Sequence, residues 1–189
     1  MKTIVFFLSI YLMALSFLNC CKKKESGPEN NTINPTPVNL ISNSSFEING
    51  QHSLTGWILN ADSYSFSYEA PPGGGFWSLA LPTGGMPFPN TIETMIPAPI
   101  GINNYKFSVY GKKKFNEAGG EAFLFIKHAD SLIISKTLGI KDTAWTFYFT
   151  NDTIYTVLGD SLCVRLLTPP EPGDPFYVVF DLCKLEKLN

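Results

Sequence analysis

The strongest constraint on the fold of this chain is a series of short apolar segments separated by clusters of Gly, Pro, Asn and Asp. Within 104–111, for example, Tyr105, Phe107 and Val109 alternate with other side chains, and no segment keeps a helical period. Alternation with period two and β-branched or aromatic content predicts half-buried strands. We expect strands at 38–41, 54–59, 63–68, 76–81, 91–96, 104–111, 121–127, 131–137, 145–150, 162–168 and 176–185.

The residues between these segments also favour strands over helices. The sequences PPGGG at 71–75 and PPEPGDP at 169–175 cannot continue a helix or a hydrogen-bonded ladder. About ten strands with no helices between them predict an all-β fold. We expect a two-sheet antiparallel β-sandwich with jelly-roll topology over 38–189.

The N-terminal segment has the pattern of a targeting signal. An apolar run over 4–18 follows Lys2 and ends just before Cys20 and Cys21. This run is shorter than the ~20 residues of a membrane span. It resembles the bacterial lipoprotein signal, in which the cysteine after the apolar run becomes lipidated. Cys21 has Leu18 at the position that the pattern requires, so we favour Cys21 and keep Cys20 as the alternative.

This resemblance divides the N-terminal part into a lipoprotein signal peptide over 1–20 and a flexible tether over 21–37. Residues 22–37 contain one large apolar residue, Ile33, among charged residues, Gly, Asn, Thr and Pro, a composition typical of disorder. Lipidation implies that the protein is anchored to a membrane by its N-terminal lipid without spanning it. The expected location is the cell envelope, at the outer membrane. The alternatives are an ordinary secretory peptide that is cleaved nearby and a short anchor that is retained.

A tripeptide pattern, Asp-Ser followed by an apolar residue, also bears on which bacteria this protein comes from. Asp130-Ser131-Leu132 and Asp160-Ser161-Leu162 resemble the O-glycosylation sites of exported proteins in bacteria of the Bacteroides group. The same tripeptides are also ordinary entries from a turn into a strand, and that alternative stays open.

The charge distribution argues against a nucleic-acid partner. After residue 37 the chain has ten Lys and Arg against fourteen Asp and Glu, with Arg165 as its single arginine. A nucleic-acid-binding domain needs a basic patch to neutralise phosphates. We therefore expect no nucleic-acid partner.

Motifs along the domain resemble galactose-binding-like jelly rolls. The sequence NSSFE at 43–47, Gly56-Trp57, and VFDLCKL at 179–185 occur in the order found in carbohydrate-binding modules of this kind. The resemblance implies a module that binds glycans, or one that serves as a spacer or as a binding unit for an envelope protein partner.

The same resemblance implies a structural calcium ion between Glu47 and Asp181. Calcium prefers several carboxylate and carbonyl oxygens, and backbone near Asn43 and Ser45 could supply the remaining ligands. The alternative is that Glu47 and Asp181 face solvent or accept hydrogen bonds from neighbouring amides.

Aromatic side chains supply the candidates for a glycan site. Tyr64, Phe66 and Tyr68 alternate with serines and therefore share one face of a strand. If that face points outward, the rings form a ladder on which sugars can stack; if it points inward, they belong to the core. Phe123 and Phe125 have the same two interpretations, because both faces of their strand are apolar.

Cys163 and Cys183 are the only cysteines of the expected domain, and export makes their oxidation possible. A hairpin centred on 169–175 would place them opposite each other and allow a disulfide. Two buried thiols are the alternative, for instance if the last two strands lie in different sheets.

Catalytic motifs are missing from the sequence. His52 and His128 are its only histidines, and neither belongs to a zinc-binding or nucleophile motif. We therefore expect no enzyme, and no cofactor other than the calcium. The leading hypothesis is a non-catalytic glycan-binding module, and the alternative is a structural or protein-partner scaffold without a glycan ligand.

Overall fold

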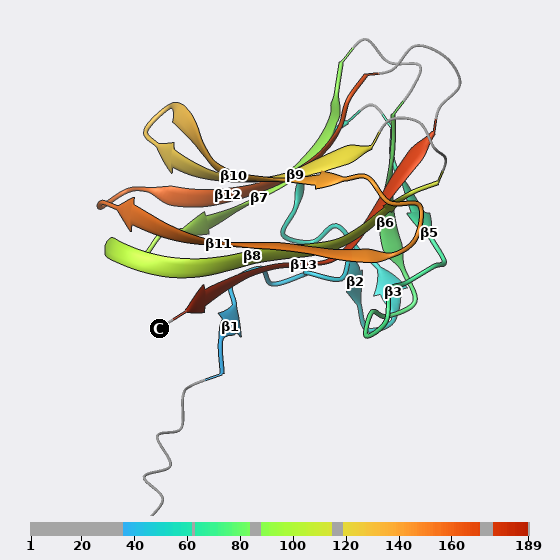
Figure 1. Cartoon of the computed structure of the whole chain (residues 1–189), viewed down its shortest axis with the longest axis horizontal. Coiled ribbons are helices and arrows are strands. Elements are labelled where there is room, and N and C mark those ends of the chain that lie inside the picture. Colours follow the sequence, from blue (N-terminus) through green and yellow to red (C-terminus); the bar gives the residue numbers. More distant parts are fainter. Residues whose placement is uncertain (1–35, 62, 84–87, 115–118, 171–175, 189) are drawn as a thin grey trace, which may run out of the picture. The chain divides into compact units, whose positions relative to one another are not determined.

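Two antiparallel sheets pack face to face around one apolar core in the computed structural model of the protein (Figure 1). The structure describes residues 36–61, 63–83, 88–114, 119–170 and 176–188. The predicted signal peptide, both lipidation candidates and most of the tether lie outside these residues. Within them, no helix is long and apolar enough to cross a membrane.

The first sheet has six strands in the order β11-β8-β13-β6-β5, with β1 paired to β13 outside this path. β8 and β13 form its centre, and Phe180 on β13 lies opposite Gly111 on β8. Its strands are β1 (Val38–Asn39), β5 (Ser65–Ser67), β6 (Ser78–Pro82), β8 (Gly101–Lys113), β11 (Thr146–Thr156) and β13 (Tyr177–Leu188).

The second sheet has five strands in the order β10-β9-β12-β7-β4 and lies above the first in Figure 1. A separate two-stranded ribbon pairs β2 with β3. The strands are β2 (Glu47–Ile48), β3 (Gln51–His52), β4 (Ile58–Asn60), β7 (Asn90–Pro97), β9 (Gly120–His128), β10 (Ser131–Ile140) and β12 (Ser161–Thr168). The chain crosses repeatedly between the two sheets, so the predicted antiparallel β-sandwich with jelly-roll topology is confirmed.

Period-two alternation builds the core. On β8, Tyr105, Phe107 and Val109 are buried between the sheets, and on β12 Leu162, Val164 and Leu166 face them from the other sheet. Each fully buried side chain of this size contributes about 1.5–3 kcal/mol of transfer free energy. The core therefore fixes which side chains of each strand face outward.

One strand is longer than its sequence predicts. Apolar alternation ends at Thr150, yet β11 continues to Thr156 in register with β8. The Asp152 carboxylate accepts a hydrogen bond from Ser135 and lies 3.6 Å from Lys136 Nζ, both on β10 of the other sheet. These partners allow a polar residue in the middle of the strand.

The expected disulfide between Cys163 and Cys183 is not formed, and both residues are free, buried thiols. Cys163 lies on β12 in the five-stranded sheet, whereas Cys183 lies on β13 in the six-stranded sheet. Cys183 belongs to the core between the sheets, but the core neighbours of Cys163 are Leu162 and Val164, so Cys163 points to the outer face. Two thiols on different sheets, one of which points away from the core, cannot meet.

We expect a reducing agent to leave the melting temperature of the domain unchanged. Burial raises the pKa of the Cys163 thiol to about 11 and raises the pKa of Cys183 as well, so neither forms the reactive thiolate at neutral pH. An alkylating reagent, followed by mass spectrometry, should modify both cysteines only after denaturation. A melting temperature that falls on reduction would mean that a bridge does form.

Candidate functional site

The two carboxylates singled out in the sequence meet at one turn. Glu47 begins β2, and its Oε2 accepts hydrogen bonds from the amides of Phe76 (2.7 Å) and Trp77 (3.0 Å). Asp181 is fully buried on β13; its Oδ1 accepts the amide of Leu182, and its Oδ2 has no hydrogen-bond partner. A buried carboxylate oxygen without a partner is costly, which marks it as a candidate ligand.

Glycines of the 71–75 turn lie against both carboxylates. A Cβ atom on Gly75 would lie 2.1 Å from a carboxylate oxygen of Glu47, and one on Gly74 would lie 2.6 Å from Asp181 Oδ2. Only glycine allows the 71–75 turn to approach both carboxylates this closely. The sequence therefore needs its glycine run here for contact with the two carboxylates as well as for turning the chain.

The backbone beside both carboxylates is strained. Phe46, directly before Glu47, has a φ of 55°, and Leu182, directly after Asp181, has a φ of 46°. Such left-handed conformations are unfavourable for residues with bulky side chains, and they cluster at functional sites. The surrounding structure holds both carboxylates in place at the expense of local backbone strain.

Electrostatics at this pair favour a bound cation. Burial raises the pKa of Asp181 to about 7, the Leu182 amide opposes this rise, and the Glu47 carboxylate adds to it. Within the described residues, no third Asp, Glu, His or Cys joins the two to form a metal-binding group. Of the loop oxygens expected to help, the Asn43 and Ser44 carbonyls already accept hydrogen bonds from Trp57 Nε1 and the Cys183 amide. The two carboxylates match the preference of a hard cation for oxygen ligands, and further oxygens, such as those of water, would have to complete its coordination.

The predicted ladder of Tyr64, Phe66 and Tyr68 does not form one flat surface. Phe66 is half-buried against the core and stacks on His52 at 4.3 Å. The Tyr64 ring stands at 88° to the Phe66 ring. Tyr68, which is 69% exposed, lies instead nearly parallel to Phe76 at 6.1 Å and 11°.

A better-defined arrangement lies on the outer face of the five-stranded sheet. Phe123 and Phe125 lie side by side on β9, with ring centroids 5.4 Å apart. Arg165 on β12 places its guanidinium 4.9 Å from the centre of the Phe125 ring. The same guanidinium binds Glu93 Oε2 on β7 through Nε (2.8 Å) and Nη2 (2.7 Å).

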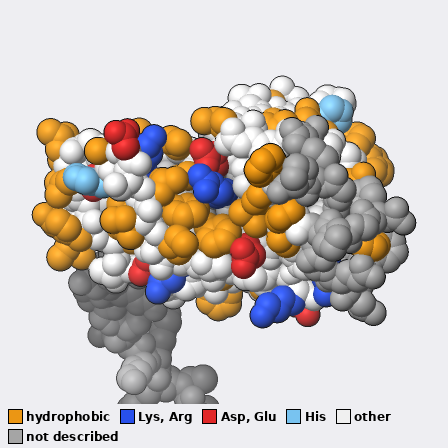
Figure 2. Space-filling model, turned by 90° about the horizontal axis from the view of Figure 1, so that it is seen from above, with side chains coloured by type: hydrophobic (Ala, Val, Ile, Leu, Met, Phe, Trp, Pro, Cys, Tyr) orange, Lys and Arg blue, Asp and Glu red, His pale blue; other side chains and the backbone are white. Residues whose placement is uncertain are grey.

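Strand register explains why these side chains meet. Arg165 lies opposite Phe123 on one side and Glu93 on the other. Phe125 and Glu93 are almost completely buried even though they face outward, because their neighbours cover them. Figure 2 looks down on this sheet and shows hydrophobic side chains around charged groups of both signs. Removal of Arg165 would leave a buried, unpaired carboxylate, which typically costs about 3–5 kcal/mol.

A hollow of about 310 Å³ continues this surface toward one end of the sheet. Glu121 and Lys141 provide its charged groups, and Gly119, Gly139 and Pro169 are among the residues that line it. Glu121 lies on β9, two residues from Phe123. Rings, a fixed ion pair and further hydrogen-bonding groups therefore follow one another along the face.

Sequence reasoning singled out Phe123 and Phe125 but missed Arg165 and Glu93. The available signal was that the only arginine of the chain stands among the apolar residues of a strand. Its partner could not be found in the sequence, because the pairing of β12 with β7 joins segments about 70 residues apart.

No family model and no curated protein matches the chain. Among solved structures, it is similar to a family 16 carbohydrate-binding module, with a TM-score of 0.60, 20% identity, and coverage of 78% of this chain and 99% of that chain. A protein from Bacteroides thetaiotaomicron VPI-5482 that is named for sugar binding has a TM-score of 0.56 and 12% identity, covering 79% of this chain and 100% of that chain.

The enzymatically active domain of tailspike protein 4 from bacteriophage CBA120 is also similar, with a TM-score of 0.58 and 12% identity. That match covers 80% of this chain but only 22% of the tailspike chain. At these identities the similarity shows the fold alone. The chain therefore has a carbohydrate-binding-module-like fold.

Free of divalent cations, the domain should lose stability as the pH rises through about 7. Because burial raises the pKa of Asp181 from 3.8 to about 7, the folded protein keeps a proton that the unfolded chain has already released. This contribution is complete below about pH 4 and is lost as the pH passes 7. Chemical denaturation in EDTA between pH 4 and 8 measures it, and Asp181→Asn should flatten the dependence. An equal slope in Asp181→Asn would assign the titration to another group.

Proposed function

We propose that this protein is a non-catalytic glycan-binding module held at the cell envelope by an N-terminal lipid. The observation that carries the proposal is the outer face of the five-stranded sheet, where Phe123 and Phe125 lie beside the Arg165–Glu93 pair. Aromatic rings and a few fixed polar groups are what a sugar-binding surface needs. The carbohydrate-binding-module-like fold supports the same conclusion.

Phe123 is the proposed stacking platform for a sugar ring. It remains partly exposed, whereas Phe125 is covered and is held under the Arg165 guanidinium. The C–H groups of a pyranose would pack on the Phe123 ring, and Arg165 would donate hydrogen bonds to its hydroxyls. Glu121 and Lys141, in the adjoining hollow, would contact the next sugar. A pre-formed ion pair lowers the entropic cost of ordering these groups on binding.

A calcium ion held by Glu47 and Asp181 would have a structural role in this module. Glu47 already ties β2 to the amides of Phe76 and Trp77, and Asp181 reaches the same turn from β13. The ion would neutralise two close carboxylates and fix the turn that presents Phe76 next to Tyr68. Tyr68 and Phe76 are the second candidate surface for glycan contact, with Tyr64 and Phe66 at its margin.

The anchor completes the proposal. Cys21, or Cys20 in the alternative, would carry the lipid, and the following residues would tether the domain, which begins at β1 (Val38–Asn39). Such an anchor would hold the module at the outer membrane of a Bacteroidetes-type envelope.

A protein-partner role is the second candidate, and it rests on a different surface. At one end of the sandwich Leu158 is 85% exposed, and Ile100, Ile102 and Tyr155 are also exposed. Apolar side chains gathered at one end of a domain are typical of a contact with another protein. An envelope assembly would use this end, including the margin of the six-stranded sheet where Tyr155 lies opposite Ile102.

Millimolar calcium should raise the melting temperature of the soluble chain that begins after Cys21, and magnesium should do so less. Binding to the folded state alone stabilises by about 2.7 kcal/mol at a concentration of 100 Kd. Asp181→Asn and Glu47→Gln should each abolish the response. Glu186→Gln, on the same strand but paired with Lys106, is the matched control and should retain it. Equal melting curves of the wild type in calcium and in EDTA would contradict the site.

A glycan array probed with the same soluble chain should give saturable binding that Phe123→Ala weakens about tenfold or more, because the stacking platform is lost. Tyr155→Ala removes an exposed aromatic ring from the far end and should bind as the wild type does. Arg165→Ala is avoided because it exposes a buried carboxylate. Circular dichroism and melting curves establish that each variant is folded.

Two other outcomes change the assignment. Binding that is lost in Tyr68→Ala and Phe76→Ala but kept in Phe123→Ala would move the site to the 71–76 turn. A folded wild-type domain that binds no glycan on a broad array would reject the proposed function and favour the protein-partner role.

A further inference from the structure

The outer face of the six-stranded sheet carries a second set of aromatic and polar side chains. Because Tyr105, Phe107 and Val109 point into the core, Lys106, Ser108 and Tyr110 on β8 face outward. The register places Phe147 opposite Tyr110 and Phe149 opposite Ser108 on β11. On the other side of β8, Lys184 lies opposite Ser108, and Glu186 lies opposite Lys106.

These side chains form a groove along β8. Ser108 is its floor: this small residue is 1% exposed and lies between the larger Phe149 and Lys184. The hollow measures about 120 Å³, and Tyr110, Phe147, Leu182 and Glu186 are among its lining residues. A groove with a small residue at its centre and large residues on both sides is open along the strand direction.

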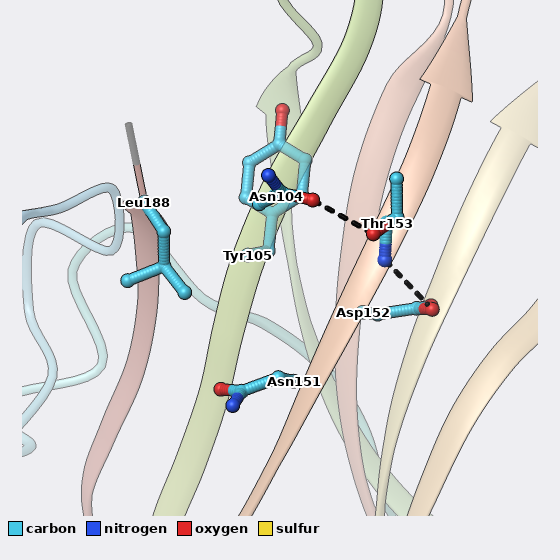
Figure 3. Close-up of a pocket in the computed structure, with 6 residues that line it drawn as sticks. All are labelled: Asn104, Tyr105, Asn151, Asp152, Thr153 and Leu188. Carbon is cyan, nitrogen blue, oxygen red and sulfur yellow. Dashed lines mark hydrogen bonds between the residues drawn. The ribbon is translucent and has the colours of Figure 1, made fainter.

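A second hollow of about 460 Å³ lies next along the same strands (Figure 3). Asn104, Asn151, Thr153 and Leu188 line it, and Thr153 Oγ1 donates a hydrogen bond to Asn104 Oδ1 (2.7 Å). Asn151 lies directly opposite Lys106, which lines the first hollow, so the two hollows adjoin. The six-residue step from Phe147 to Thr153 spans about 20 Å at the rise of a strand.

The chemistry changes along this groove from aromatic to amide. Phe147 and Phe149 are 40% and 57% exposed, and their rings lie 5.6 Å apart at 22°. Lys106 Nζ lies 5.5–5.6 Å from both ring centres, where it can donate to a hydroxyl above them. At the other end Asn104 and Asn151 provide amide donors and acceptors. This combination suits an extended molecule with apolar C–H faces and many hydroxyls.

We propose that this groove is a second glycan-binding site, in which an oligosaccharide lies lengthwise along β8. Sugar rings would stack on Phe147 and Phe149, and later sugars would bind the two asparagines. A protein partner fits less well, because a stable protein interface buries about 800 Å² on each side over an apolar centre, whereas this groove is narrow and half polar. The site lies on the opposite face from Phe123, so it goes beyond the site of the proposed function.

Two sites on opposite faces predict a bivalent module. One domain could hold two polysaccharide chains, or two parts of one long chain, and its apparent affinity for polymers would exceed that for short oligosaccharides. The two sites are separable by substitution because they share no residue and no sheet.

Affinity electrophoresis of the soluble chain in gels containing xylan, β-1,4-galactan or mixed-linkage β-glucan tests the proposal. On a polysaccharide that retards the wild type, we expect Phe147→Ala combined with Phe149→Ala to weaken binding about tenfold, as Phe123→Ala alone does. The triple variant should run as it does without polysaccharide. Titration calorimetry with a short oligosaccharide of the retarding polymer should give two sites for the wild type and one for each partial variant.

Tyr155→Ala is the matched control, since Tyr155 lies on the same strand and the same face but outside the groove. If the folded Phe147→Ala, Phe149→Ala variant keeps wild-type retardation and stoichiometry while Phe123→Ala loses them, the second site is wrong and the proposed function stands. If retardation is lost in the Phe147→Ala, Phe149→Ala variant but kept in Phe123→Ala, this groove is the only glycan site. A wild type that no polysaccharide retards would overturn both.

Discussion

The inward packing of alternate residues on β8 is the constraint on which both outer faces depend. Tyr105, Phe107 and Val109 fill the space between the sheets, and β8 pairs with β11 on one side and β13 on the other. A slip of one residue would exchange core and surface along the whole strand. The core therefore fixes the register, and the register fixes which side chains line the groove over Ser108. On the other sheet, Leu162, Val164 and Leu166 fix the outward position of Arg165 in the same way.

The Glu47–Asp181 pair connects parts of the chain that the sheets alone would leave apart. Glu47 binds the amides of Phe76 and Trp77, and a buried Asp181 meets the same turn from the last strand. Burial of Asp181 and the strained backbone at Phe46 and Leu182 both oppose folding. Such costs persist where they serve a site, which is why this pair is a stronger candidate than the many exposed carboxylates of the domain.

The sequence was sufficient to predict the β-sandwich and the alternation on β8 and β12. The placement of Glu47 near Asp181 was implied only by the resemblance to galactose-binding-like jelly rolls. The sequence was not sufficient for features that depend on pairing between segments far apart in the sequence. β11 continues past Asp152 by pairing with β8, and Asp152 finds its partners Ser135 and Lys136 on a third strand. The Cys163–Cys183 bridge is absent because the last two strands lie in different sheets and Cys163 points to the outer face. The ladder of Tyr64, Phe66 and Tyr68 fails for a related reason: β5 is only three residues long, so Tyr64 and Tyr68 lie outside it and the regular alternation of a strand does not hold.

The two outer faces differ in how firmly their polar groups are held, and this difference bears on what each can recognise. Arg165 is fixed by two contacts to a buried carboxylate and by the Phe125 ring, so its donors point in defined directions. Lys106 lies over two exposed rings and 4.0 Å from Glu186, at the outer limit of an ion pair. A rigid guanidinium favours discrimination between sugar stereoisomers, whereas a mobile ammonium over aromatic rings tolerates several. In the proposed glycan-binding role, the five-stranded sheet would therefore be the face that provides specificity, and the groove along β8 would add avidity for a polymer.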